Sequence, residues 1–521
     1  MNKKNLILTS LALASVAGAK AGALKPNIIF ILADDMGYGD VSYLDKNQKL
    51  NTVHLDKMAR EGVVFKDAHT SSSVSTPTRY GVLTGRYNWR STLKQGVLTG
   101  YSKALMEPER STVATMLSKA GYTTAYIGKW HLGWNWALKS GNEAKYDAKT
   151  KTDNIDYTKK ITKGPQDYGF EYSYGFCASL DFPPYVYVEN SMPTSVPDRV
   201  TVSERKSKTD GAWWREGLTA PDFEHAKVLP HMIDKSIDYI NEKSKGDKPF
   251  FLYLPLPAPH TPILPTEEYR GKSGIGDYGD FVLMVDDMVG KIFTALKAAG
   301  CDDNTLVVFT TDNGCSPAAD IDGLIAQGHY PNSIYRGHKA DLFDGGHRVP
   351  CLVRYPDGFK HHEVEQTVCL TDFYATFASL VGYELQDNEA EDSYNILPAL
   401  KSKKEVKTIR EATVHHSIMG HFTIRKGDWK LLMSASSGGW SAPTPRDKKA
   451  LASLPLIQLY NMKTDPSETT NLWDKHPEVV EELTSLLTKY VEDGRSTPGA
   501  AQKNSGQYPW KQLTWMSQDV K

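Results

Sequence analysis

The sequence predicts an α/β protein with a large mixed, mostly parallel sheet flanked by helices, plus a smaller C-terminal α+β subdomain with an antiparallel sheet. Three observations support this. Short continuous apolar runs suit strands that are buried on both faces, as in a parallel sheet. Helical patterns lie between these runs. Toward the C-terminus the runs are separated by Gly, Ser and Pro, which is typical of antiparallel strands.

Six runs rich in β-branched or aromatic residues are the predicted strands of the large sheet. They are Asn27–Ala33, Val63–Phe65, Thr123–Ile127, Phe250–Leu256, Thr305–Thr310 and Cys351–Arg354. Helices are predicted over Ser111–Ala120, with a Ser cap, and over Val282–Ala299, each ending at a Gly. The lysine-rich stretch Ala137–Lys163 is predicted to be an elaborated loop.

The polar stretch Asp387–Lys404 is predicted to connect the two parts of the chain, so we assign residues 24–400 to the large domain and 401–521 to the subdomain. The subdomain strands are predicted at Ala412–Ser417, His421–Arg425, Trp429–Met433 and Leu456–Tyr460. A helix is predicted over Pro477–Tyr490.

The overall charge is nearly balanced. The chain has 521 residues, with 61 basic and 62 acidic side chains and a net charge of -1. This composition predicts neither a nucleic-acid partner nor stable membrane association, so any anion site has to be built locally. The five cysteines are widely spaced without a C-x-x-C, which indicates neither a zinc cluster nor a disulfide framework.

The N-terminus has the pattern of a secretory signal peptide. Lys3 and Lys4 precede the apolar run Leu6–Val16, and A-x-A sites end at Ala19 and Ala23. The alternative is a membrane anchor, but the run is well short of the ~20 apolar residues that a span needs. We expect residues 1–23 to be removed and the protein to be exported to the periplasm or secreted.

Polar side chains gather where four predicted strands end. Asp34 and Asp35 follow the first strand, Asp312 and Asn313 follow TLVVFT, and further strands lead to Lys129 with His131 and to His260. Ligands bind beyond the carboxyl ends of strands in open parallel sheets, so we expect these side chains to meet. Three carboxylates and an amide oxygen suit Ca²⁺ or Mg²⁺ better than zinc.

The segment STPTR begins another predicted helix. Thr76 is expected to cap it and Pro77 to occupy its first turn, which places Ser75 at the helix N-terminus, where an anion is favoured. Arg79 follows Ser75 at i+4 and can reach back toward it.

The S-x-P-x-R pattern followed by LTGR resembles the signature of the formylglycine-dependent sulfatases in its serine form. These enzymes are part of the alkaline-phosphatase-like superfamily. The resemblance covers nearly the whole mature chain, because PNIIFILADDMGYGD, YTTAYIGKWHLG, PAPHTP, TDNG, GHKADLFDGGHRVP and IRKGDWKLL follow in the same order.

The resemblance implies a set of residue roles. Ser75 would be oxidised to formylglycine (3-oxoalanine), whose hydrated aldehyde attacks sulfur. One Ca²⁺ ion would be held by Asp34, Asp35, Asp312, Asn313 and the modified Ser75. Arg79 and Lys129 would hold the hydrate and the sulfate, His131 would assist release of sulfate from the enzyme, and Lys339 would flank the sulfate oxygens. We assign His260 as the general acid for the departing sugar oxygen, since histidine titrates near neutral pH.

Two positions depart from the commoner family pattern. Ser75 replaces a Cys, which implies a radical-type, oxygen-independent maturation enzyme as a partner. Asp344 stands where many members have Glu, which keeps the charge and is expected to have little consequence.

The predicted activity is hydrolysis of sulfate esters on a sulfated glycan, of glycosaminoglycan or mucin type. We favour a sulfated galactose or N-acetylgalactosamine and exo action. Candidate sugar contacts are Asp181, Trp213, His225, His415 and His416. The alternatives are a phosphate-ester hydrolase of the same fold with Ser75 as a plain nucleophile, and a catalytically idle glycan-binding protein.

Overall fold

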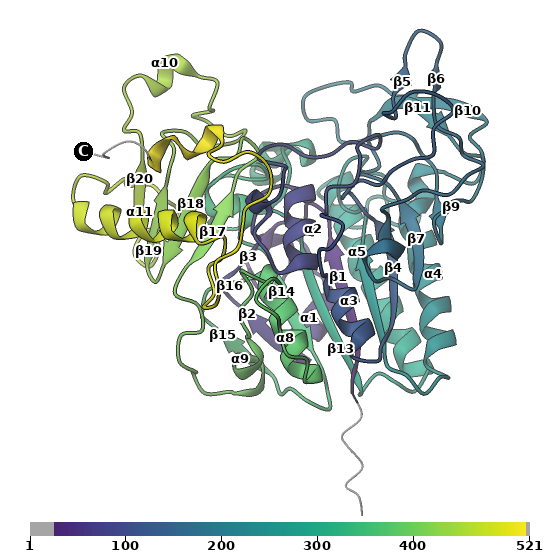
Figure 1. The fold of residues 1–521 in the computed structure, drawn as a ribbon, viewed down its shortest axis with the longest axis horizontal. Helices are drawn as coiled ribbons and strands as arrows, with labels where there is room; N and C mark the ends of the chain where they lie inside the picture. Colours follow the sequence, from purple (N-terminus) through teal and green to yellow (C-terminus); the bar gives the residue numbers. More distant parts are fainter. Residues whose placement is uncertain (1–24, 517–521) are drawn as a thin grey trace, which may run out of the picture.

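The computed structural model describes residues 25–516 and contains one ten-stranded sheet as its main element (Figure 1). The predicted signal peptide lies outside the described residues. The strand order is β15-β2-β14-β13-β1-β12-β4-β7-β8-β9, and the five central strands from β13 to β7 all run parallel. β14 is antiparallel to both of its neighbours, so the sheet is mixed but mostly parallel, as predicted.

All six predicted strands of the large sheet are present. They are β1 (Asn27–Ala33), β2 (Val63–Phe65), β4 (Thr123–Lys129), β12 (Phe250–Pro255), β13 (Thr305–Thr311) and β14 (Cys351–Arg354). The other strands of this sheet are β7 (Tyr172–Phe176), β8 (Val188–Glu189), β9 (Met192–Pro193) and β15 (His362–Val364). β1, β12 and β13 are buried along almost their whole length, which explains their uninterrupted apolar sequences.

Two groups of helices flank the sheet (Figure 1). One group consists of α2 (Ser75–Thr84), α3 (Val113–Lys119) and α8 (Phe373–Val381), which contact one another. The other consists of α1 (Val53–Glu61), α4 (Val228–Lys243) and α5 (Asp277–Ala298), in which α5 touches both of the others. α4 and α5 are amphipathic and bury their apolar faces against the sheet side of this layer.

The C-terminal part has its own antiparallel sheet, as predicted. Its strands are β17 (Thr413–His416), β18 (Phe422–Lys426), β19 (Trp429–Leu432) and β20 (Gln458–Asn461), and α11 (Pro477–Glu492) packs on β18 and β19. Its core also takes in Tyr87 and Trp89 from the large domain. The two parts therefore share buried apolar surface.

Two predicted helix caps were wrong, and the predicted loop contains a short additional element. Helix α3 begins at Val113, and its cap is Thr112, whose Oγ1 accepts the N–H of Thr115 at 3.1 Å. The signature helix is preceded by Val74, while the hydroxyl of Thr76 accepts the N–H of Leu98 at 3.2 Å. The lysine-rich loop contains a short hairpin of β5 (Tyr146–Asp147) and β6 (Thr152–Asp153).

Between residues 25 and 516, no helix combines the length and the apolar character needed to cross a bilayer. The five cysteines all have free thiols, and four of them are buried.

Candidate active site

The ends of β1, β13 and β12 lie together, and this brings the predicted site residues to one edge of the sheet. The N–H of Asp312 donates to the carbonyl of Ala33 at 3.1 Å, and the N–H of Asp34 donates to the carbonyl of Ala258 at 3.0 Å. The residues that follow the three strands are thus fixed to one another by backbone hydrogen bonds. The predicted meeting of the strand ends is present in the structure.

Three buried carboxylates and one amide form the centre of the site. Asp35 has a left-handed backbone (φ 65°), and its N–H donates to Asp312 Oδ1 at 3.2 Å. Asn313 Nδ2 donates to Asp35 Oδ1 at 2.7 Å. A non-glycine residue in this conformation costs of order 1 kcal/mol or more and is typical of functional sites. The strain at Asp35 fits a carboxylate that is aimed by the surrounding structure.

Asn313 indicates a metal ion, in addition to the cluster of buried carboxylates. Its Oδ1 atom is buried and has no hydrogen-bond partner among the described residues. A buried acceptor without a donor is costly, so it needs an explanation such as an ion. Asn313 Oδ1 and the three carboxylates provide oxygen donors of the kind that Ca²⁺ prefers.

Three cations balance the three carboxylates in the buried site. Lys129 Nζ lies 2.5 Å from Asp34, Arg79 Nη2 lies 2.8 Å from Asp312, and Lys339 Nζ lies 2.7 Å from Asp35. Formal charges of three minus and three plus cancel. A divalent cation would therefore give the centre a net charge of about +2, which favours an anionic ester.

Asp34 remains ionised despite its burial. Burial alone would raise the pKa of its carboxyl group, but the charges of Lys129, His260 and Arg79 outweigh that effect and hold the pKa well below its usual range. Asp34 is therefore able to serve as an anionic ligand at neutral pH.

Ser75 is the first residue of α2 and points its hydroxyl into this cluster. Its Oγ atom donates to Asp34 Oδ1 at 3.3 Å and accepts from Lys129 Nζ at 3.3 Å. Arg79, one turn later, donates to the carbonyl of Lys129 at 3.3 Å. The helix N-terminus, the lysine and the arginine together create a positive environment around position 75.

The two predicted catalytic histidines use opposite ring nitrogens. His260 Nδ1 donates to the carbonyl of Thr261 at 2.6 Å, which leaves Nε2 facing the site, 3.6 Å from Asp35 Oδ2. His131 Nε2 donates to the carbonyl of Leu98 at 2.8 Å, and its buried Nδ1 has no partner in the described chain. The backbone of His131 is also left-handed, with φ 56°.

His131 is held neutral. Its burial and the nearby charges of Lys129 and Arg79 all lower the pKa of the imidazole well below its usual range. Since Nε2 carries the proton, Nδ1 offers a lone pair within the site. His131 is therefore suited to accept a hydrogen bond at Nδ1.

Asp181 is a predicted sugar contact whose charge interacts with that of His260. It is almost buried, pairs with Arg215, and the pKa of its carboxyl is lowered because His260 and Arg215 outweigh the effect of burial. Arg215 lies 4.1 Å over the ring of Phe182 and 4.9 Å over the ring of Trp213. The partner Arg215 was missed from the sequence, because nothing local marks a long-range ion pair.

His225 and Trp213 lie on the same side as this pair. The ring of His225 stacks on Trp214 with centroids 4.1 Å apart, and burial lowers the pKa of its imidazole to about 3. Nε1 of Trp213 and Nε2 of His225 are buried without partners in the described part of the chain. Both atoms remain candidates for polar contacts with a ligand.

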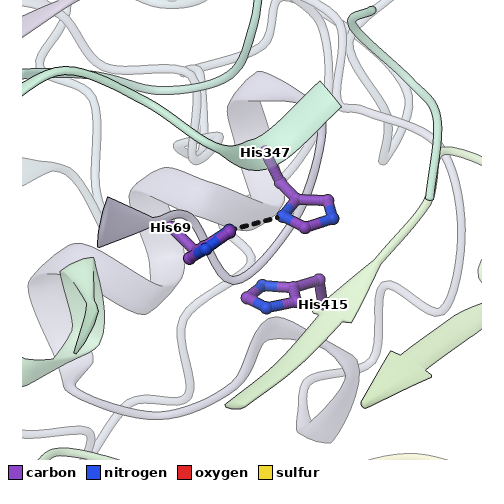
Figure 2. Close-up of side chains that lie close together, drawn as sticks. All are labelled: His69, His347 and His415. Atoms are coloured by element: carbon purple, nitrogen blue, oxygen red, sulfur yellow. Dashed lines mark hydrogen bonds between the residues drawn. The ribbon is translucent and has the colours of Figure 1, made fainter. Parts of the chain in front are cut away.

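The structure corrects the assignment of His415 and His416 as sugar contacts, because each ring is only 1% exposed. His415 donates from Nδ1 to the carbonyl of Thr70 at 2.7 Å and stacks on His347 at 4.1 Å (Figure 2). His416 Nδ1 contacts the side chain of Asn88 at 2.9 Å. Both rings pack between the large domain and the subdomain, where a sugar has no access.

The match of the chain to known families agrees with this geometry. A family model described as Sulfatase matches residues 26–383. The chain belongs to the sulfatase family. Its members are sulfuric ester hydrolases, and we describe this chain as one.

Two sequence relatives and one solved structure cover nearly the whole sulfatase chain. N-acetylgalactosamine-6-O-sulfatase of Bacteroides thetaiotaomicron is 34% identical over 89% of this chain and 92% of its own. Arylsulfatase A of Homo sapiens is 29% identical over 97% of this chain and 95% of its own. A structure described under glycosaminoglycan metabolism by Bacteroides thetaiotaomicron has a TM-score of 0.77 and 31% identity, covering 90% of this chain and 99% of that one.

Carbohydrate sulfatases are thus prominent among the relatives of this chain. A solved structure in complex with k-i-k-neocarrahexaose is 24% identical, with a TM-score of 0.67, and supports the fold alone.

Proposed function

We propose that this sulfatase removes the 6-O-sulfate from N-acetylgalactosamine or galactose at the end of a sulfated glycan, with one Ca²⁺ ion and a formylglycine at position 75. The observation that supports this most directly is the place of Ser75 Oγ, 3.3 Å from both Asp34 and Lys129 at a helix N-terminus. The choice of sugar follows the relatives named above, including the N-acetylgalactosamine-6-O-sulfatase at 34% identity.

Asp34, Asp35, Asp312 and Asn313 would hold the calcium ion together with the modified residue 75. The unpartnered Oδ1 of Asn313 supports this ligand set, because it is the one member that has neither a proton donor nor a charge partner. When bound, the ion polarises a sulfate oxygen and offsets its charge. Lys339 Nζ lies 2.8 Å from Asp35 Oδ2. With the ion offsetting the charge of Asp35, Lys339 would also interact with the substrate.

Formylglycine, when present, supplies a geminal hydroxyl that serves as the nucleophile. Around it, Lys129 and Arg79 orient the hydroxyl and neutralise the sulfate. Lys129 is fully buried, and burial is the largest influence that lowers the pKa of its ammonium group. This makes Lys129 better suited than a surface lysine to exchange a proton with its neighbours.

His260 would donate the proton from Nε2 to the departing sugar oxygen, since its Nδ1 proton is committed to the Thr261 carbonyl. His131 would accept a hydrogen bond at Nδ1 when sulfate leaves, because its Nε2 proton is committed to the carbonyl of Leu98. Each histidine thus keeps one nitrogen for the structure and one for the reaction.

Sugar recognition would come from Asp181 with Arg215, from Trp213 and from His225. Carboxylate and imidazole groups accept or donate hydrogen bonds to hydroxyls, and the indole ring offers an apolar face for a pyranose.

The serine form of the signature would require maturation by a radical-type enzyme. We retain the expectation that the chain is exported.

The test is release of inorganic sulfate from N-acetylgalactosamine 6-sulfate and galactose 6-sulfate. The protein is matured, and its formylglycine at residue 75 is verified by mass spectrometry. We expect turnover that EGTA abolishes and Ca²⁺ restores. Release of phosphate from phosphate esters, with no sulfate release by verified protein, would favour the phosphate-ester hydrolase instead. Binding without any turnover would favour the idle glycan-binding protein.

A further inference from the structure

We infer that a cavity beside the catalytic residues binds an uncharged sugar unit adjacent to the sulfated one. This inference rests on the proposed function and extends it to a second residue of the glycan. The cavity has a volume of about 340 Å³, and its lining includes Asp210, Ile263, Asp277, Ala318 and Asp320. That volume is in the range of small-molecule sites and is sufficient for one pyranose.

The walls of the cavity are continuations of the segments that carry the catalytic residues. Ile263 comes three residues after His260, and its N–H donates to the carbonyl of Gly211 at 2.8 Å. Ala318 and Ala319 come shortly after Asn313. Short chain connections therefore join two walls of the cavity to the segments that carry His260 and Asn313.

Tyr278 joins the cavity to the metal-ligand residues. Its buried side chain lines the cavity, and its hydroxyl lies 3.3 Å from the carbonyl of Asp35 and 2.5 Å from Asp40 Oδ2. Asp40 is in turn fixed by His329 at 2.8 Å. One wall of the cavity is thus held in a fixed position relative to the predicted calcium ligands.

The lining has the two chemical characters that sugars require. Ile263, Ile275, Ala318 and Leu324 give an apolar surface for the C–H face of a ring. The carboxylates accept hydrogen bonds from hydroxyls, and an ionised carboxylate only accepts. Asp210 is already oriented, because its carboxylate accepts the N–H of Lys206 at 2.8 Å and the N–H of Ala212 at 3.0 Å.

The same carboxylates disfavour an acidic neighbour. None of the residues that line this cavity in the described chain is Lys, Arg or His, whereas three are Asp. Arg205 and Lys206 face Asp210 from outside the lining and partly offset its charge, while Asp277 and Asp320 are exposed. A uronate or a second sulfate in the cavity would be repelled. The cavity thus favours chains in which the neighbour is a neutral hexose or hexosamine over uronate-containing chains.

The experiment measures binding by calorimetry, using the protein with unmodified Ser75, so that the outcome does not depend on turnover. The probes are N-acetylgalactosamine 6-sulfate and two disaccharides in which this residue is joined to galactose or to glucuronate. We expect the galactose disaccharide to bind about tenfold more tightly than the monosaccharide, and the glucuronate disaccharide to gain nothing.

Two variants locate the effect. Ala318→Phe fills the cavity, so it should remove the tenfold gain and leave the monosaccharide Kd within about twofold. Asp277→Asn with Asp320→Asn should improve binding of the glucuronate disaccharide about fivefold. Asp238→Asn, an exposed acid on α4, is the matched control and should change nothing. The double Asp277→Asn, Asp320→Asn variant and its control still test the inference if Ala318→Phe fails to fold.

Equal affinities for the monosaccharide and the galactose disaccharide would overturn the inference, as would a loss with Ala318→Phe that is the same for both. Sulfate release by the matured protein is measured separately. If the protein shows the expected binding pattern but the matured protein releases no sulfate, the proposed reaction is wrong and the cavity assignment stands.

Discussion

Replacing Lys129 with Met tests the charge balance of the site most directly. Lys129 is fully buried, and its Nζ lies 2.5 Å from Asp34 and 3.3 Å from Ser75 Oγ. With this lysine removed, the three carboxylates face two cations, and the formal charge without a metal becomes -1. The variant should therefore bind Ca²⁺ more tightly than the parent protein while losing sulfate release.

The size of the effect follows from the geometry. A calcium ion bound to Asp34 at about 2.4 Å would lie about 5 Å from Lys129 Nζ. At an effective dielectric constant of about 20, the repulsion between them is about 7 kcal/mol, which is an upper bound. Movement of the lysine and screening leave a fraction of that, and we expect about 1.4 to 2.8 kcal/mol, or 10- to 100-fold tighter binding.

Calorimetric titration of the Ser75 protein with Ca²⁺ gives the affinity. Lys430→Met is the matched control, because Lys430 is equally buried and paired, at 2.7 Å from both Asp344 and Glu468, but lies in the subdomain. It should destabilise the fold without changing the calcium affinity. Unchanged or weaker calcium binding by Lys129→Met would refute the ligand set.

Three further predictions concern catalysis and pH. Ser75→Ala should abolish sulfate release, by at least about a thousandfold, while calcium still binds by calorimetry; residual turnover near the parent rate would contradict the role of residue 75. His260→Asn should lower kcat about 100-fold or more on sugar sulfates but under about tenfold on an aryl sulfate, whose leaving group needs no proton; equal losses would argue against a general acid. Burial raises the pKa of Glu468 from 4.5 to about 7, so the folded state binds the extra proton and stability should fall as pH rises from about 4.5 to 7. Glu468→Gln should flatten that slope in denaturant unfolding, and an unchanged slope would assign the pH dependence elsewhere.

The strands of the large sheet were predictable because their burial on both faces makes them continuous apolar runs. β1 and β14 have the predicted bounds, and β13 extends by one residue. The start of α3 was misplaced because Ser111 and Thr112 are both good capping residues, and only the backbone geometry selects Thr112. The short hairpin of β5 and β6 carries too few residues to produce a recognisable alternation.

The grouping of the predicted site residues at one edge of the sheet was predictable for a different reason. The carboxyl ends of parallel strands converge, so acidic and basic side chains that follow strands far apart in the chain meet at one edge. This rule, together with the signature around Ser75, predicted which side chains would lie together before any geometry was available. It could not reveal the orphan oxygen of Asn313 or the pairing of Asp181 with Arg215, since both depend on which side chain faces which.

The sequence could not decide the role of His415 and His416. A pair of histidines next to a strand in the subdomain reads equally well as a sugar contact or as packing, because polarity says nothing about exposure. The tertiary structure decides for packing, with His415 stacked on His347 inside the protein (Figure 2). Asp344 is likewise part of the buried contact between the two parts, accepting from Lys430 at 2.7 Å.

The sequence by itself determined the fold class, the family and which polar residues follow the strands. All three depend on local periodicity and on motifs contiguous in the chain. The tertiary structure alone decided the charge balance of three carboxylates with three cations, the free nitrogen of each catalytic histidine and the acid-lined cavity beside them. The charge balance arises from contacts between segments hundreds of residues apart, such as Lys339 with Asp35, and the free histidine nitrogens depend on how each ring is oriented; no local pattern encodes either.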